Sequence, residues 1–307
     1  MTDTNADATP DEPRIVADTH CHTGEGPLYH PDEEAVYFLD IPQADLYRYD
    51  LAAESHERVL DAEGAIGGFT IQEDGELLLF CDEGRIQPYS REDGLGDPVF
   101  ESIDGEEDAR FNDVIADPAG RVFAGTMHRS EPAEHPGSLY RLDTDGSLTE
   151  LETGLPIPNG MGFTPDRNQL YFTETVAGQV YRYDYDESTG EISNREVFVD
   201  ASGGEGNPDG MTVDAEGYVW SAFWDGGRVA RYDPGGTEVE RVAFPAKKVS
   251  AVTFGGTDYD AAYVTTALGP GEGSAGTREE EGSGAGALFE VDLGVDGVPE
   301  FRSDVEV

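Results

Sequence analysis

Short apolar runs separated by polar turns recur along nearly the whole chain. The clearest unit begins at Pro208-Asp209-Gly210, where a polar residue leads into a β-rich run, an Asp/Gly turn and a second strand containing Trp220. A glycine turn and a further strand ending in Tyr232-Asp233 complete it. No long segment shows the 3.6-residue apolar period of a helix, and 39 glycines and 18 prolines divide the chain into short pieces. The pattern therefore predicts many short strands and few helices.

The same unit can be read six times. Its second strands are centred about 41 to 49 residues apart, on Tyr37, Leu78, Phe123, Tyr171, Trp220 and Tyr263. A unit of that length with three or four short strands cannot bury both faces of its own sheet and needs a neighbour on each side. We therefore predict an all-β fold, a six-bladed β-propeller with four-stranded antiparallel blades. The alternative, one twelve-stranded sandwich or two smaller ones, does not explain a regular repeat.

The repeat also sets the domain boundaries. Residues 1–13 are acidic and polar, and we expect a disordered tail there. Residues 14–307 are expected to form one propeller domain, in which the strand-like segment Arg14–Ala17 closes the ring against the last blade. Residues 269–286 are rich in Gly and Glu, interrupt the sixth unit between two strands, and are predicted to form a flexible surface loop. A lid over the site is the alternative for this loop.

The charge balance excludes some partners. The chain has 65 acidic and 19 basic residues, a formal net charge of −46, and such a surface repels nucleic acid and anionic membranes. We interpret the acidic coat as an adaptation to high salt, where mobile ions screen charge within about 3 Å at 1 M. An acidic coat also argues against large apolar interfaces, so we expect a monomer or a small homo-oligomer.

The expected compartment is the cytoplasm. The N-terminal residues lack the basic and apolar regions of a signal peptide, and no run approaches the roughly 18 apolar residues of a membrane span. Cys21 and Cys81 are too few for a disulfide framework, so two free thiols in a reducing compartment are expected, with Cys81 in the core.

Equivalent residues of the six units lie at one level of a propeller. The residue just before each innermost strand is therefore expected at the mouth of the central channel, which predicts a ring of Glu25, Gly68, Asn112, Asn159, Asp209 and Ser250. Taken alone, Asn159 and Asp209, each followed by glycine, read as turn residues. Their equivalent positions in the repeat favour a site instead.

Oxygen donors dominate this ring. Glu25, Asn159 and Asp209 offer three oxygen ligands and two negative charges, which predicts one divalent metal ion, with calcium, magnesium, manganese and zinc all compatible. Such an ion polarises a carbonyl or activates water. A competing zinc motif, His20-Cys21-His22, would place two histidines on one face of a strand, but no third or fourth ligand is evident nearby in the sequence.

Several longer motifs carry a family resemblance. They are Gly24-Glu25-Gly26-Pro27, Arg110-Phe111-Asn112-Asp113, Gly125-Thr126-Met127, Asn159-Gly160 and Pro208-Asp209-Gly210-Met211. Through them the chain resembles, over nearly its full length, the SMP-30/gluconolactonase/regucalcin family of six-bladed propellers. The resemblance implies a metal-dependent hydrolase that opens sugar lactones, such as glucono-, xylono- or arabinonolactone, with Glu25, Asn159 and Asp209 as metal ligands.

The resemblance also implies roles for individual residues. Asp209 would act as general base or orient the attacking water, and Arg110 and Asn112 would hold substrate hydroxyls and the developing oxyanion. Three residues after Gly125-Thr126-Met127, where several family members carry a substrate-contacting glutamate, this chain has Ser130. Ser130 is therefore the predicted substrate contact at that position, and a different sugar preference is expected. Two other functions remain open: a calcium-binding protein without activity, and a related propeller esterase or phosphotriesterase.

The acidic coat yields a stability prediction. Because the uncompensated charges repel one another, the midpoint of thermal unfolding, Tm, is expected to rise between dilute buffer and molar KCl. Differential scanning calorimetry across a KCl series measures this. A Tm that does not rise with salt contradicts the interpretation of the coat as a salt adaptation.

Overall fold

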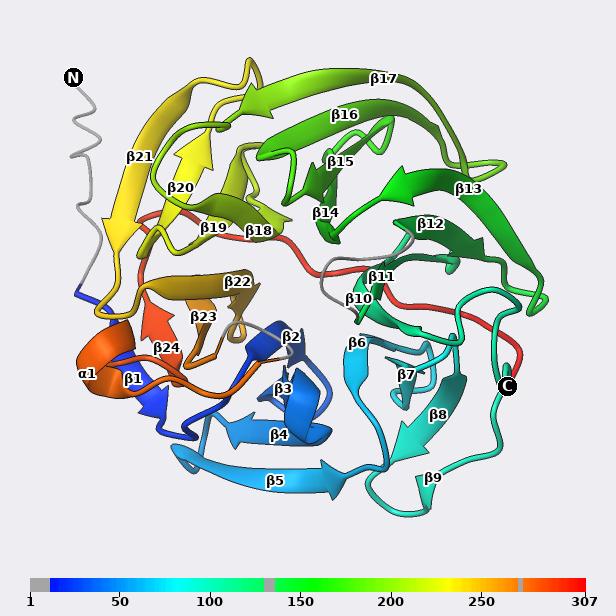
Figure 1. Ribbon diagram of the computed structural model, residues 1–307, viewed down its shortest axis with the longest axis horizontal. Helices are drawn as coiled ribbons and strands as arrows, with labels where there is room; N and C mark the ends of the chain where they lie inside the picture. Colours follow the sequence, from blue (N-terminus) through cyan, green and yellow to red (C-terminus); the bar gives the residue numbers. More distant parts are fainter. Residues whose placement is uncertain (1–11, 130–135, 270–272) are drawn as a thin grey trace.

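The computed structural model describes residues 12–129, 136–269 and 273–307. In this part of the chain six four-stranded antiparallel sheets are arranged as blades around a central axis (Figure 1). The predicted all-β, six-bladed propeller is confirmed. Residues 1–11 of the expected tail, and Ser130, lie outside the described residues.

Each blade is a meander that starts at the channel and ends at the rim. From the channel outward, blade 1 comprises β2 (Gly24–His30), β3 (Ala35–Asp40), β4 (Asp45–Asp50) and β5 (Ser55–Asp61), with the short 3-10 helix η1 (Ile41–Gln43) between β3 and β4. Blade 2 comprises β6 (Ile66–Ile71), β7 (Leu77–Cys81), β8 (Ile86–Ser90) and β9 (Gly94–Leu95). Blade 3 comprises β10 (Ala109–Ala116), β11 (Val122–His128), β12 (Gly137–Leu142) and β13 (Leu148–Leu155).

The second half of the ring repeats this order. Blade 4 comprises β14 (Pro158–Phe163), β15 (Gln169–Glu174), β16 (Gln179–Asp186) and β17 (Glu191–Asp200). Blade 5 comprises β18 (Asn207–Val213), β19 (Val219–Trp224), β20 (Arg228–Tyr232) and β21 (Glu238–Ala243). Blade 6 comprises β22 (Lys248–Gly255), β23 (Ala261–Ala267), β24 (Leu288–Val291) and β1 (Arg14–Ala17), with the helix α1 (Arg278–Glu281) between β23 and β24.

The N-terminal strand closes the ring. β1 pairs antiparallel with β24, with Ile15 opposite Phe289, so the last blade takes its outer strand from the start of the chain. This is the closure that the sequence predicted for Arg14–Ala17. It covers the outer edge of β24, makes β1 the outer strand of blade 6, and ties the two ends of the domain together.

The inner strand of each blade is irregular at the level of the predicted ring. In all six blades its pairing with the next strand shifts register near the strand's start, at Glu25/Leu28, Ile66/Gly68, Phe111/Val114, Pro158/Met161, Pro208/Met211 and Val249/Ala251. A β-bulge bends a strand and redirects its side chains. The predicted ring residues therefore lie within the inner strands, at or beside these bulges, and not just before the strands as the sequence suggested.

The Asn-Gly and Asp-Gly pairs are not turns. Asn159-Gly160 lies in β14 and Asp209-Gly210 lies in β18. A Cβ atom at Gly160 would lie 2.5 Å from the Asp209 backbone oxygen, and one at Gly210 would lie 2.4 Å from the Cβ of Ala251. The turn interpretation is therefore wrong, because these glycines are required where neighbouring inner strands approach one another closely.

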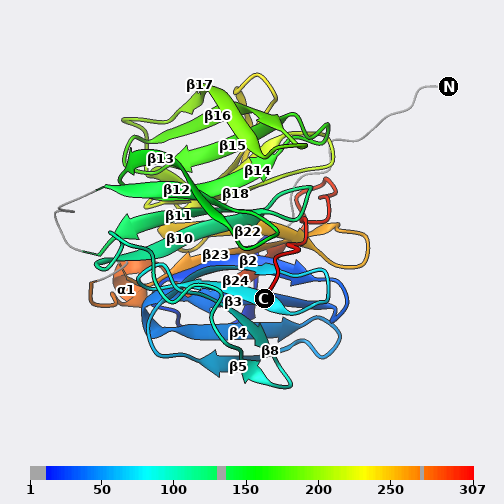
Figure 2. The same ribbon diagram turned by 90° about the vertical axis from the view of Figure 1, so that its right-hand side faces the viewer.

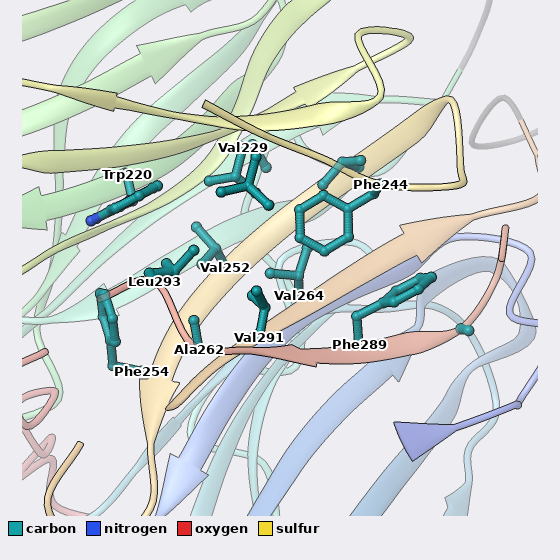
Figure 3. Packing of buried hydrophobic residues seen from close by; sticks show 14 residues of the cluster. Trp220, Val229, Phe244, Val252, Phe254, Ala262, Val264, Phe289, Val291 and Leu293 are labelled. Carbon is teal, nitrogen blue, oxygen red and sulfur yellow. The ribbon is translucent and has the colours of Figure 1, made fainter. Parts of the chain in front are cut away.

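Apolar side chains fill the space between adjacent blades. Figure 3 shows the cluster that joins blades 5 and 6, in which Trp220 and Val229 pack with Val252, Val264 and Phe289. All five are at most 3% exposed. Full burial of such side chains contributes roughly 1.5–3 kcal/mol each. Packing between blades therefore stabilises the ring and holds the inner strands in register with one another.

Buried aspartates fix the turns that follow two of the inner strands. Asp214, after β18, accepts hydrogen bonds from Trp220 Nε1 at 3.1 Å and Arg231 Nε at 2.9 Å, and from two backbone N–H groups of its own turn. Asp117, after β10, pairs in the same way with Arg121 Nε at 2.6 Å. Both carboxylates are completely buried. Each therefore links a turn to the strands of its blade.

The two faces of the propeller are covered by different segments (Figure 2). The described part of residues 269–286 includes α1, which begins at a capping box formed by Thr277 and Glu280, and it buries Ala285 completely. Its predicted flexibility stays a prediction. At the other ends of the inner strands, bridges of Gly297 to Asp214 and of Ser303 to Gln72 hold the C-terminal segment across β18 and β6. Within the described ranges no helix is both long and apolar enough to cross a membrane.

Loss of the Asp214 carboxylate is expected to destabilise the fold. In Asp214→Ala, Arg231 and Trp220 lose a buried acceptor. Removing one partner of a buried ion pair lowers the free energy of unfolding by about 3–5 kcal/mol. Asp233→Ala, which removes an aspartate that bonds only the backbone of its own exposed turn, is the matched control. Chemical unfolding in molar KCl measures both, and equal losses of stability for the two variants contradict the prediction.

Candidate active site

A cavity of about 300 Å³ lies at the starts of the inner strands. Its lining includes Glu25 from β2, Arg110 and Asn112 from β10, Asn159 from β14 and Asp209 from β18. Residues from four different blades are thus brought together because equivalent positions of the blades meet at one level. Every predicted site residue that the structure describes lines this cavity, and their roles stay predictions.

The two carboxylates of the cavity lie beside each other, with Glu25 half-buried and Asp209 buried. Asp209 is 3% exposed, and its Oδ1 has no hydrogen-bond partner among the described residues. Burial, with repulsion from Asp113, raises the pKa of Glu25 to about 8. Burial and the carboxylate of Glu25 raise the pKa of Asp209 well above its ordinary value, while Arg110 lowers both. The positive charge of Arg110 is therefore not enough to keep both Glu25 and Asp209 at their ordinary pKa values.

The amides of the cavity are oriented by neighbouring strands. Asn159 Nδ2 donates to Thr175 Oγ1 at 3.1 Å, which turns the amide oxygen away from Thr175. Asn112 Nδ2 donates to the backbone oxygen of Pro158 at 2.8 Å. Each amide nitrogen is thus held by a neighbouring strand, and the Asn159 side chain also hydrogen-bonds Asp209, which opposes the rise in the pKa of that carboxyl.

These donors fit a hard divalent cation. Two carboxylates and one amide supply oxygen ligands, and a buried carboxylate oxygen without a partner is an atom that a cation would satisfy. Across the described ranges no group of three or more His, Cys, Asp or Glu side chains forms an alternative metal cluster. Glu25, Asn159 and Asp209 are therefore the candidate ligands.

Arg110 is the basic group of the cavity. It is 3% exposed, and its Nη1 donates to the backbone oxygen of Phe111 at 2.9 Å and to Asn112 Oδ1 at 2.8 Å. The guanidinium and the Asn112 amide are therefore coupled and act as one polar unit. A buried guanidinium suits the recognition of sugar hydroxyls or of an oxyanion.

Comparison with known proteins identifies the family. The family model described as the SMP-30/gluconolactonase/LRE-like region matches residues 23–268. This chain belongs to that family. It is 52% identical to the pentonolactonase XacC of Haloferax volcanii, over 95% of this chain and 98% of that protein. It is 34% identical to regucalcin of Bos taurus, over 92% of this chain and 95% of that protein.

A solved structure matches the whole propeller. The crystal structure of a calcium-binding protein, regucalcin, from Agrobacterium tumefaciens superimposes with a TM-score of 0.86 at 27% identity, covering 96% of this chain and 97% of that one. The resemblance inferred from the sequence motifs is thus confirmed at the level of family and fold.

Two predicted ring positions do not line the cavity of this SMP-30/gluconolactonase-family protein. Gly68 lies deeper in the channel, where a Cβ atom would come within 2.8 Å of Val114. Ser250 is completely buried, and its Oγ donates to the backbone oxygen of Gly24 at 2.5 Å, which links blade 6 to blade 1. Both positions therefore serve packing between blades.

The His20-Cys21-His22 sequence does not form a zinc site in the described structure. His20 has a left-handed φ of 56°, so this segment lacks the extended geometry that would place both histidines on one face of a strand. Cys21 is a buried free thiol, and burial raises its pKa. Cys81 is also free and lies in the core, as predicted.

The structure adds residues that the sequence interpretation missed. Asp113 follows Asn112 at the β10 bulge and lines the channel next to Gly68, and burial together with Glu300 raises its pKa to about 7. Thr23 lines the cavity itself, and its buried Oγ1 has no hydrogen-bond partner in the described residues. Trp224, at the end of β19, lines it as well. The motif Arg110-Phe111-Asn112-Asp113 could have pointed to Asp113. No sequence signal pointed to Thr23 or Trp224, because neither occupies one of the six ring positions.

The raised pKa of Asp113 predicts a pH-dependent stability. Its pKa is 3.8 in the unfolded chain and about 7 in the fold, so the folded protein binds the proton more tightly. The stability that this provides is complete below the unfolded pKa and is lost as the pH rises through about 7. In EDTA, Asp113→Asn is therefore expected to exceed the wild-type Tm by a margin that grows from pH 5 to pH 7 and then levels off.

At pH 8 the Tm of Asp113→Asn should exceed that of the wild type by several degrees, since 1 kcal/mol moves the Tm of a chain of 150–250 residues by about 2–4 °C. Asp104→Asn, at an exposed position, controls for the removal of one negative charge. The same Tm profile for both variants contradicts the assignment of Asp113 as a group that binds a proton more tightly in the fold.

Proposed function

We propose that this protein is a metal-dependent lactonase that hydrolyses aldonolactones, such as glucono-, xylono- or arabinonolactone, to aldonic acids. The observation that carries the proposal is the buried, unpartnered Oδ1 of Asp209 beside Glu25, in a cavity that also contains Arg110. The 52% identity to a pentonolactonase over 95% of the chain supports the same substrate class.

One divalent metal ion, calcium, magnesium, manganese or zinc, would be held by Glu25, Asn159 and Asp209. When bound, such an ion supplies Lewis-acid polarisation of the ring-ester carbonyl and lowers the pKa of a coordinated water. It would also replace the positive charge that the buried carboxylates lack, and would hold both in their ionised forms.

The protein's own side chains then perform the remaining steps. Asp209 orients the attacking water and accepts its proton as the water oxygen bonds to the carbonyl carbon. Arg110, coupled to Asn112, donates to the oxygen that gains negative charge. The ring C–O bond breaks, its oxygen takes up the proton that Asp209 accepted and becomes a hydroxyl, and the product acid releases its own proton to solvent at neutral pH. Ser130 stays proposed as a further substrate contact.

Calcium binding without catalysis is the second candidate, because the matching Agrobacterium tumefaciens structure is described as a calcium-binding protein. The Arg110–Asn112 unit argues for catalysis. A storage site needs oxygen ligands only, whereas a buried arginine beside the ligands weakens cation binding and suits an anionic transition state.

Proton release from lactones tests the proposal. In molar KCl the protein is expected to hydrolyse at least one aldonolactone, to lose the activity in EDTA and to recover it when a divalent ion is restored. Asp209→Asn and Glu25→Gln are expected to lose about 100-fold or more, the usual scale for a general base or for a lost metal. Glu205→Gln, at an exposed glutamate, is the matched control.

The outcomes separate the candidates. Calcium binding without metal-dependent hydrolysis of any lactone favours the second function. Hydrolysis that is unchanged in EDTA contradicts the metal-dependent mechanism, and an Asp209→Asn variant at the wild-type rate contradicts the role of Asp209.

A further inference from the structure

One wall of the cavity is formed by Trp224 and Asp225, at the end of β19 and in the turn that follows. Trp224 is only partly buried, unlike the other tryptophan of the chain, Trp220, which has no exposed surface. A sugar ring has hydroxyl groups at its rim and C–H groups on its faces, and the C–H faces pack well on aromatic rings. Trp224 offers such a ring within the same cavity as the candidate metal ligands.

Lys248 contacts both residues of this wall, Trp224 and Asp225, on the side away from the cavity. It is one of two lysines in the chain and is 7% exposed. Its Nζ lies 3.1 Å from Asp225 Oδ1 and 5.9 Å from the centroid of the Trp224 ring. The single ammonium thus contacts both members of the wall. Asp225 itself has a left-handed φ of 58°, a conformation that few non-glycine residues adopt.

The loop that contains α1 holds Lys248 in turn. Glu281 Oε2 accepts a hydrogen bond from Lys248 Nζ at 2.5 Å, and the Glu281 backbone oxygen accepts one from the Lys247 N–H at 2.7 Å. Gly284 N donates to the Pro245 backbone oxygen at 2.8 Å, and Ala285 packs into a small buried cluster. The Gly- and Glu-rich segment is therefore docked against the start of β22, where it supplies the second carboxylate of Lys248.

We propose that Trp224 contacts the C–H face of the sugar ring and that Lys248, held by Glu281, is a positioning residue that sets the Trp224–Asp225 wall and thereby the preference among sugar lactones. This inference rests on the proposed function for its substrate class. The segment that contains α1 would then influence substrate selection through the contact of Glu281 with Lys248, without closing over the site.

Binding of a lactone analogue tests the contact directly. A gluconolactam or xylonolactam, in which a ring amide replaces the ester, resists hydrolysis and can be titrated into the metal-loaded protein. Tryptophan fluorescence is expected to change on binding, because Trp224 lies at the cavity while Trp220 is sealed in the core. Trp224→Phe is expected to abolish the change while keeping an aromatic ring, and Trp224→Leu to weaken lactam binding about tenfold.

Steady-state kinetics separate contact from structure. Trp224→Leu is expected to raise KM about tenfold with little change in kcat, since a face contact is made equally in ground and transition states.

Lys248→Met is expected to raise KM several-fold and to alter the ratio of rates on pentono- and hexonolactones, with Lys248→Arg restoring much of the loss. Lys247→Met, which removes the exposed neighbouring lysine, is the matched control, and Glu281→Gln is expected to show a smaller effect of the same kind.

The results distinguish this inference from the proposed function. Trp224-dependent lactam binding without lactone hydrolysis contradicts the lactonase and supports the sugar contact. Lactone hydrolysis with an unchanged KM in Trp224→Leu overturns the contact alone. Lys248→Met behaving like Lys247→Met overturns the positioning role. Should Lys248→Met fail to fold, Glu281→Gln still decides it, because an unchanged ratio of rates on pentono- and hexonolactones in that variant overturns the role.

Discussion

Repulsion among the carboxylates that face the central channel is the interaction on which the chemistry of this molecule depends. Glu25 and Asp209 lie beside each other with Asp113 close by, and burial raises the pKa of all three. In water these groups would ionise and separate. In the propeller the inner strands hold them together, so the site must bind either protons or a cation. Arg110 supplies part of the missing charge, and a divalent ion would supply the rest.

The propeller can sustain this repulsion because its stability comes from elsewhere. Packing between blades, as in the cluster around Trp220, contributes along the full height of each sheet, and β1 ties the last blade to the first. The bulges that turn the site residues toward the channel recur in every inner strand, and Gly160 and Gly210 let adjacent strands approach closely at that level. The features that place the carboxylates are thus part of the repeat itself.

The repeat made the fold predictable, since six units of similar length leave few other ways to bury both faces of each sheet. It also predicted that Glu25, Asn159 and Asp209 lie together at the channel, and all three line the cavity. It could not tell which equivalent side chains reach the cavity. Ser250 bonds to the neighbouring blade instead, a matter of side-chain direction at a bulge that sequence spacing does not encode.

Residues outside the repeat positions were harder to find. Asp113 enters the channel only because the β10 bulge lets two successive residues face inward, and alternation along a regular strand would have placed it outside. Lys248 lies behind the cavity wall and approaches Trp224 through the packing of blade 5 against blade 6. The contact of Glu281 with Lys248 joins residues 33 positions apart, through a segment whose composition indicated only a loop.

The central claim is that Glu25, Asn159 and Asp209 form one divalent cation site at the mouth of the channel. Anomalous diffraction from crystals grown with Mn²⁺ in molar KCl tests it most directly. One strong peak is predicted in the cavity, within about 2.6 Å of the carboxylate oxygens of Glu25 and Asp209 and the amide oxygen of Asn159. The absence of a peak there, or a peak held by other residues such as Asp113 and Glu300, would contradict the claim.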